Sequence, residues 1–184
     1  MSTTSAAVTD AQRFPIGRFE RPTKFTVEQR AAHVDHIALQ PTRLAAAMSG
    51  LDTADYATPY RPGGWTVRQL VHHMADSHAN AYIRLKLALT EQEPTIKPYD
   101  QDAWVALADS ALVSPLVSLT LFTAIHERMV AVLQSLEPMQ FERMLMHPEN
   151  GPMSIDQLVA LYAWHGDHHV RHLELFRERY RESR

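Results

Sequence analysis

The sequence contains no cysteine. This absence excludes disulfide bonds, thiolate metal sites, iron–sulfur clusters and a cysteine nucleophile. A chain without thiols can still bind a transition metal, but only through imidazole, carboxylate and water ligands. Any metal site in this protein must therefore be built from histidine and acidic residues.

An excess of positive charge is also lacking, because the formal net charge is -3 with histidine neutral. A nucleic-acid-binding protein normally presents a basic face, so no nucleic-acid partner is expected. No apolar run approaches the roughly 20 residues that cross a bilayer, and no membrane association is expected. Residues 1–11 contain neither a basic segment nor an apolar stretch of signal-peptide length, so we expect a cytoplasmic location.

Apolar spacing and helix-start signals predict an all-α fold. Helical patterns cover residues 26–48, 66–89, 115–136 and 154–180, and four helices of this length imply an antiparallel or mixed four-helix bundle. The second and fourth segments open with a capping box, in which Thr or Ser and a Gln three residues later satisfy the first backbone N–H groups. Pro41 is expected to kink or split the first helix, because proline lacks a backbone donor.

Shorter features complete the predicted domain. A short helix is expected over residues 101–107, whereas residues 141–152 look irregular, and no convincing strand pattern appears. Two prolines and a glycine predict an extended N-terminal arm over residues 14–22. Small polar residues predict a disordered tail over residues 1–12, which leaves residues 13–184 as a single domain.

Histidine is abundant, with 11 residues in a chain of 184. Seven of them lie in two short segments: His72, His73 and His78, and then His165, His168, His169 and His172. In the last predicted helix, His165 and His169 lie near the middle of the apolar face. His172 lies toward the edge of that face, and His168 lies further round. Residues four apart point the same way, so His165 and His169 can bind one ion together. His168 and His172 share this spacing, but metal sites in bundles are built from inward-pointing side chains.

A purely structural role is the alternative for this pair. A single buried histidine is usually only hydrogen-bonded. Burying two imidazoles without partners would cost several kcal/mol, a penalty that a shared cation removes. Periodicity alone therefore does not decide whether His165 and His169 bind a metal or have a structural role.

A third ligand could come from the helix that follows Thr66. Its residues at spacings of three and four form a polar stripe: Gln69, His73, Asp76, Ser77, Asn80 and Arg84. This stripe could be a solvated face, but His73 lies beside the apolar stripe and can point into the bundle. Three histidines with an open position are typical of a catalytic site, and zinc and nickel both suit imidazole.

The remaining histidines carry weaker signals. His72 and His78 are interpreted as surface residues or as neighbours of the ligands. A solvated face is the favoured interpretation for His33 and His36 on the first helix. The other two, His126 and His147, show no pattern.

Several motifs are similar to those of a known family. The segments Pro62–Gln69 (PGGWTVRQ) and Val71–His78 (VHHMADSH) resemble the first signature of the YfiT branch of the DinB superfamily. Tyr162–His169 (YAWHGDHH) resembles its second signature. Phe14–Gly17 (FPIG) and Thr95–Asp100 (TIKPYD) are further matches.

The resemblance covers about residues 13–177 and implies a DinB-like four-helix bundle that forms a homodimer. It also implies one divalent ion per chain, zinc or nickel, held by His73, His165 and His169, and all three ligand positions are kept. Members of this family have been described as metal-dependent hydrolases. Relatives join a low-molecular-weight thiol such as bacillithiol to an electrophile, and others are mycothiol-dependent isomerases.

We expect a thiol S-transferase, because the lack of cysteine fits a nucleophile that arrives with the substrate. A hydrolase that activates water and a non-enzymatic metal-binding stress protein are the alternatives. Asp76 and His168 are candidates for a general base, or for orienting a ligand imidazole. Asn80 and Arg84 are candidates for binding a carboxylate or sugar of the small-molecule substrate.

Overall fold

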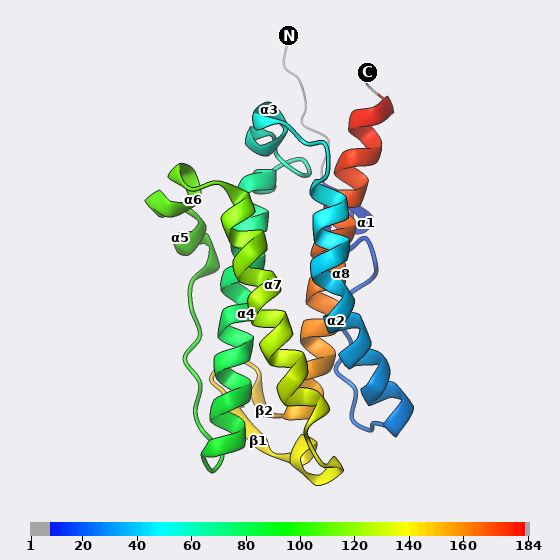
Figure 1. The fold of residues 1–184 in the computed structure, drawn as a ribbon, viewed down its shortest axis with the longest axis vertical. Helices are drawn as coiled ribbons and strands as arrows, with labels where there is room; N and C mark the ends of the chain where they lie inside the picture. Colours follow the sequence, from blue (N-terminus) through cyan, green and yellow to red (C-terminus); the bar gives the residue numbers. More distant parts are fainter. Residues whose placement is uncertain (1–7, 183–184) are drawn as a thin grey trace.

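Four long helices form the protein, as the sequence predicts. The computed structural model describes residues 8–182, and the four helices are α2 (Val27–Met48), α4 (Val67–Thr90), α7 (Pro115–Gln134) and α8 (Ile155–Glu182). They run side by side along the long axis of the molecule (Figure 1). Helix α2 packs on α7 and α8, and α4 packs on the same two helices. The predicted four-helix bundle is therefore confirmed.

Reciprocal caps begin three of the long helices. Thr26 and Gln29 cap α2, and Thr66 and Gln69 cap α4, each pair exchanging side-chain-to-backbone hydrogen bonds of 3.0 to 3.2 Å. Ser154 and Gln157 do the same at the start of α8. Each cap satisfies N–H groups that would otherwise lack partners in the first turn, which explains why the helix starts could be predicted closely.

Among the described residues, seven short elements connect or flank these helices. They are α1 (Asp10–Arg13), α3 (Thr53–Ala57), α5 (Gln101–Val105), α6 (Ala108–Leu112), a 3-10 helix η1 (Pro138–Glu142), β1 (Met144–His147) and β2 (Gly151–Ser154). The predicted short helix around Trp104 corresponds to α5.

Two predictions about irregular segments are wrong. Residues 141–152 were expected to lack regular structure, yet β1 and β2 pair as an antiparallel hairpin, with Met144 opposite Ser154 and His147 opposite Gly151. Strands of four residues are too short to show a clear alternating pattern. Residues 10–12 of the expected disordered tail belong to the capped helix α1, whereas residues 1–7 lie outside the described residues.

Helix α7 corrects a third expectation, which was that no apolar run of the sequence is long enough to cross a membrane. By length and composition alone it could do so, with a mean hydropathy of 1.5 over its apolar window. The core helix of a globular bundle meets the same criterion, and Phe122, Met129 and Leu133 of α7 are buried in the core.

Pro41 does not split α2, which continues unbroken to Met48. Because proline has no N–H, the carbonyl of Ile37 one turn earlier loses its helical donor. That carbonyl instead receives a hydrogen bond of 2.7 Å from Nδ1 of His126 on α7. The proline thus opens a backbone acceptor toward the centre of the bundle.

Helices α2 and α8 approach each other closely at Gly166. A Cβ atom at this position would overlap the side-chain amide of Gln40. Gln40 is fully buried, and its Nε2 donates to the carbonyls of Tyr162 and Ala163 at 3.2 and 2.8 Å. The amide cannot easily move aside, so the contact requires glycine.

Replacing Gly166 with alanine should therefore destabilise the protein by about 1–3 kcal/mol, the usual cost of overpacking a core. Helix propensity alone predicts the opposite sign, a gain of about 0.5–1 kcal/mol. Urea denaturation would measure the free energy of unfolding. The loss should shrink when Gln40 is also replaced by alanine, and a stabilised Gly166→Ala variant would contradict the proposed contact.

Candidate metal centre

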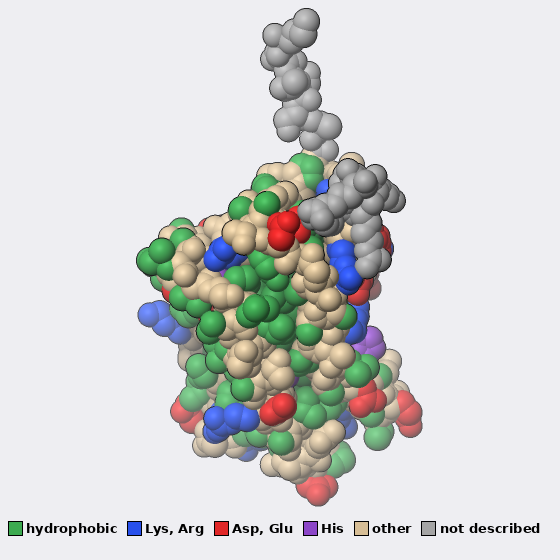
Figure 2. All heavy atoms as spheres, turned by 45° about the horizontal axis from the view of Figure 1, so that its top comes forward, with side chains coloured by type: hydrophobic (Ala, Val, Ile, Leu, Met, Phe, Trp, Pro, Cys, Tyr) green, Lys and Arg blue, Asp and Glu red, His purple; other side chains and the backbone are tan. Residues whose placement is uncertain are grey.

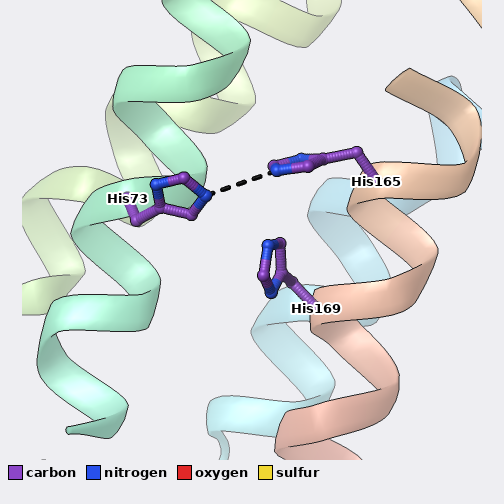
Figure 3. A group of neighbouring side chains, drawn as sticks. All are labelled: His73, His165 and His169. Carbon is purple, nitrogen blue, oxygen red and sulfur yellow. Dashed lines mark hydrogen bonds between the residues drawn. The ribbon is translucent and has the colours of Figure 1, made fainter. Parts of the chain in front are cut away.

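Three histidines from two helices meet at the centre of the bundle. His73 projects from α4, and His165 and His169 project from successive turns of α8 (Figure 3). Nε2 of His73 lies 3.3 Å from Nε2 of His165. One ligand nitrogen from each of the three rings lies within 4.8 Å of the other two. Figure 3 shows all three rings directed toward one another.

The geometry fits a divalent transition metal. Two imidazole nitrogens about 2.0–2.1 Å from a tetrahedral ion lie about 3.3–3.4 Å apart, and the separation between His73 and His165 has this value. Burial lowers the pKa of His73 to about 4, although Asp102 opposes the shift. Burial and the neighbouring histidines hold the pKa of His165 and of His169 well below 6.5. The three rings are neutral at pH 7, as metal ligands must be.

The three histidines line a cavity of about 460 Å³. Its other side chains include Arg13, Phe14, Arg61, Trp65, Asp102, Trp164 and His168. An ion held by three imidazoles at the wall of such a cavity keeps a coordination position that a small molecule can reach. This arrangement is typical of a catalytic rather than a closed structural site.

A second histidine group, His168, His169 and His172, shares His169 with the first. It is less suited to a cation because the guanidinium of Arg61 is close enough to lower the pKa of both His168 and His172, so a second cation would meet positive charge. Nε2 of His172 donates to the carbonyl of Gln12 at 3.1 Å, which leaves Nδ1 as its nitrogen with a lone pair.

Only one of the four weaker candidates lies at the cavity. His168 lines it, stacks on Trp164 with ring centroids 4.6 Å apart, and has an Nδ1 without a partner among the described residues. Asp76 is half-buried, and burial raises its pKa to about 6 with help from Asp109, but it does not line the cavity.

The structure places the two predicted substrate-binding residues elsewhere. Asn80 donates to the carbonyl of Asp76 in its own helix. Arg84 is buried and donates to the hydroxyl of Tyr162 and to the carbonyl of Lys97. Since neither side chain lines the cavity, a role in binding substrate at the metal is not supported.

Three further charged residues at the cavity, Arg13, Arg61 and Asp102, were not predicted from the sequence. Asp102 accepts a hydrogen bond of 2.9 Å from the indole of Trp65. Arg13 and Arg61 directly precede the FPIG and PGGW motifs, so their position beside these motifs was a signal.

The other histidines have separate surroundings. His72 contacts the hydroxyl of Ser118 at 2.7 Å, and the exposed His36 pairs with Asp167 of α8. His78, predicted to be a surface residue or a neighbour of the ligands, is completely buried and contacts Nδ1 of His165 at 3.2 Å.

Single replacement of His73, His165 or His169 with alanine should reduce bound metal to a small fraction of one ion per chain, since each removes one of three ligands. Elemental analysis of purified protein would measure the content. The matched control is His168→Ala, which removes a neighbouring imidazole and should retain the metal. Full occupancy in all three ligand variants would refute the site.

Comparisons with known proteins agree with this geometry. The sequence pattern of the DinB superfamily matches residues 36–173. A protein from Bacillus mycoides, provisionally named a metal-dependent hydrolase, is 47% identical over 91% of this chain and 96% of its own length. A similarly named protein from Bacillus thuringiensis is 46% identical with the same coverage.

A solved structure is also closely similar. YfiT from Bacillus subtilis, described as a probable metal-dependent hydrolase with an unusual four-helix bundle topology, superposes with a TM-score of 0.89. The two chains are 39% identical, and the match covers 92% of this chain and 97% of the other. The family pattern spans most of the sequence, and the relatives match nearly end to end, so this chain belongs to the DinB superfamily.

Proposed function

We propose that this protein is a metal-dependent enzyme that joins a low-molecular-weight thiol to an electrophile. The observation that carries the proposal is the opening of three neutral imidazoles into a cavity of about 460 Å³ that two arginines also line. The names of the relatives support metal dependence. Zinc and nickel both suit a three-imidazole site.

The ligand histidines would determine the charge of the site. When bound, a divalent cation supplies Lewis acidity that lowers the pKa of a thiol or a water at its open position. His73, His165 and His169 donate lone pairs and carry no negative charge that would offset the cation. The site would therefore favour an anionic nucleophile, and in a chain without cysteine a thiolate must come from the substrate.

Arg13 and Arg61 would bind the anionic part of that substrate. Neither forms a salt bridge to an acidic side chain among residues 8–182. Arg61 donates through Nε to the hydroxyl of Tyr60 and through Nη1 to the carbonyl of Pro62, which leaves Nη2 for a carboxylate. Glutathione and bacillithiol both carry carboxylates. Trp65 and Trp164 offer apolar surface on the same cavity wall for the rest of the reacting pair.

Hydrolysis is the second candidate. The relatives' names favour it, and two groups at the cavity could accept a proton from water. Asp102 is one, and His168, with its unpartnered Nδ1, is the other. Burial lowers the pKa of His168 to about 3, so the ring is neutral at pH 7 but a weak base, which counts against it in this role.

Metal-loaded protein should form conjugates when incubated with bacillithiol, glutathione or coenzyme A and a generic electrophile, and should not hydrolyse esters or amides. Replacing Arg61 with alanine should raise KM for the thiol about tenfold or more with a smaller change in kcat, because a charge-assisted hydrogen bond contributes about 1.5–3 kcal/mol.

The matched control is Arg128→Ala on α7, away from the cavity, which should leave both constants unchanged. Turnover without thiol would select the hydrolase. Absence of both reactions in a protein that binds metal would favour a metal-binding protein without catalytic function.

We also propose that the protein forms a homodimer through α6 and the first half of α7. Hydrophobic side chains gather on this face (Figure 2), where Leu112, Leu116, Val117 and Leu121 are between 46% and 82% exposed. A 20-residue helix with this composition gives its outer face little charge. A second copy would cover these side chains.

Replacing Val117 and Leu121 together with aspartate should therefore yield a monomer of unchanged helix content. Sedimentation equilibrium would measure the mass, and Val27→Asp on the even more exposed start of α2 is the control. A wild-type protein that is monomeric at micromolar concentration would contradict the dimer. Binding of the wild type to lipid vesicles would instead assign the face to a membrane.

A further inference from the structure

Behind the candidate metal centre, a row of three histidines crosses the whole bundle. Nδ1 of His165 on α8 lies 3.2 Å from Nε2 of His78 on α4. Nδ1 of His78 lies 2.9 Å from Nε2 of His126 on α7. Nδ1 of His126 then lies 2.7 Å from the carbonyl oxygen of Ile37 on α2. One continuous line of hydrogen bonds thus joins a metal ligand to the backbone of the opposite helix.

The identity of the last group gives the line a direction. A carbonyl oxygen can only accept, so Nδ1 of His126 must carry the proton. A neutral imidazole has one donor and one acceptor, so Nε2 of His126 accepts from Nδ1 of His78. By the same logic, Nε2 of His78 accepts from Nδ1 of His165. The proton of His165 is then on Nδ1, and its Nε2 presents a lone pair toward His73.

Burial supports this assignment of the protons. His78 is completely buried, and His126 is 1% exposed. Burial lowers the pKa of His126 to about 4 and holds that of His78 well below 6.5, so both rings are neutral. The rings of Phe122 and Tyr162 pack against His78, with centroids 4.8 and 5.1 Å away.

Reversing the line would be costly. The lone pair of His126 Nδ1 would then face the lone pairs of the Ile37 carbonyl, which Pro41 deprives of its helical donor. Such an arrangement leaves a buried acceptor unsatisfied. The proline in α2 therefore contributes to selecting one of two directions of hydrogen bonding.

We propose that His78 and His126 are positioning residues that hold His165 in the Nδ1-protonated tautomer, with Nε2 ready to bind the metal. The proposal rests on the metal site put forward above as part of the proposed function. It applies to His165 in particular, since Nδ1 of His73 and of His169 has no hydrogen-bond partner among the described residues.

The first test uses the metal-free full-length protein labelled with ¹⁵N-histidine. Long-range proton–nitrogen correlation spectra distinguish the two neutral tautomers, and His165 should be protonated on Nδ1. A predominantly Nε2-protonated His165 would overturn the proposal. Because this spectrum requires neither metal nor turnover, its result is independent of whether the protein is a transferase.

The second test breaks the line and measures metal affinity. His126→Phe keeps a ring of similar size but cannot accept from His78, so it should mix the tautomers of His165 and weaken zinc binding about 10-fold or more, as loss of a ligand's hydrogen-bond partner commonly does. His126→Gln restores an acceptor for His78 and should recover most of the zinc affinity. This variant keeps the proposal testable if the His126→Phe protein does not fold.

His72→Phe is the matched control. It replaces another buried histidine of the bundle, one that contacts Ser118 instead of this line, and should change neither the tautomer nor the affinity. Wild-type tautomer and zinc affinity in a folded His126→Phe protein would refute the positioning role. An equal loss of affinity in the His72 control would reduce the effect to general destabilisation and refute it as well.

Discussion

The structure depends on one constraint, which is that a buried imidazole must be neutral and needs partners for two different nitrogens. Where water is excluded, protein groups or a cation supply such partners, although Nδ1 of His73 and of His169 has none among the described residues. The line that runs through His78 and His126 satisfies both nitrogens of each ring and ends on a backbone carbonyl. At the other end, His165, His73 and His169 bring their nitrogens together, where a cation can accept all three lone pairs. The candidate metal centre thus lies at one end of a hydrogen-bond line and is not an isolated cluster.

This constraint explains two residues that would weaken an isolated helix. Pro41 removes a hydrogen bond from α2, and the released carbonyl of Ile37 becomes the fixed end of the line. Gly166 lowers the helix propensity of α8 next to His165, and its missing Cβ gives room to Gln40. In both cases a loss in local helix stability permits a contact between α2 and a neighbouring helix, which is α7 at Ile37 and α8 at Gln40.

The parts of this architecture that could be predicted are those encoded within a single element. The capping boxes at Thr66 and Ser154 are local, and helical phase favours His165 and His169 over their neighbours as inward-pointing residues. His73 needed the resemblance to a family, because a polar stripe does not reveal which way it faces. His126 has no pattern in sequence, since its partners lie on α2 and α4 and meet it only through packing. The cavity arginines also reach the site only through packing, although each directly precedes a family motif. The hairpin was missed because its strands have four residues each.

The charge of the centre restricts its chemistry further than the ligand set does. All three ligands are neutral, so the charge of a bound divalent ion would be undiminished, and Arg13 and Arg61 add two more positive groups against the single carboxylate of Asp102. A cation alone would be repelled from such a cavity if the three lone pairs did not hold it. An anion, in contrast, gains from every one of these groups. A closed structural site has no need of this surplus, because its fourth ligand comes from the protein. The surplus fits the proposed enzyme, in which the nucleophile and the binding group of the substrate would both be negative.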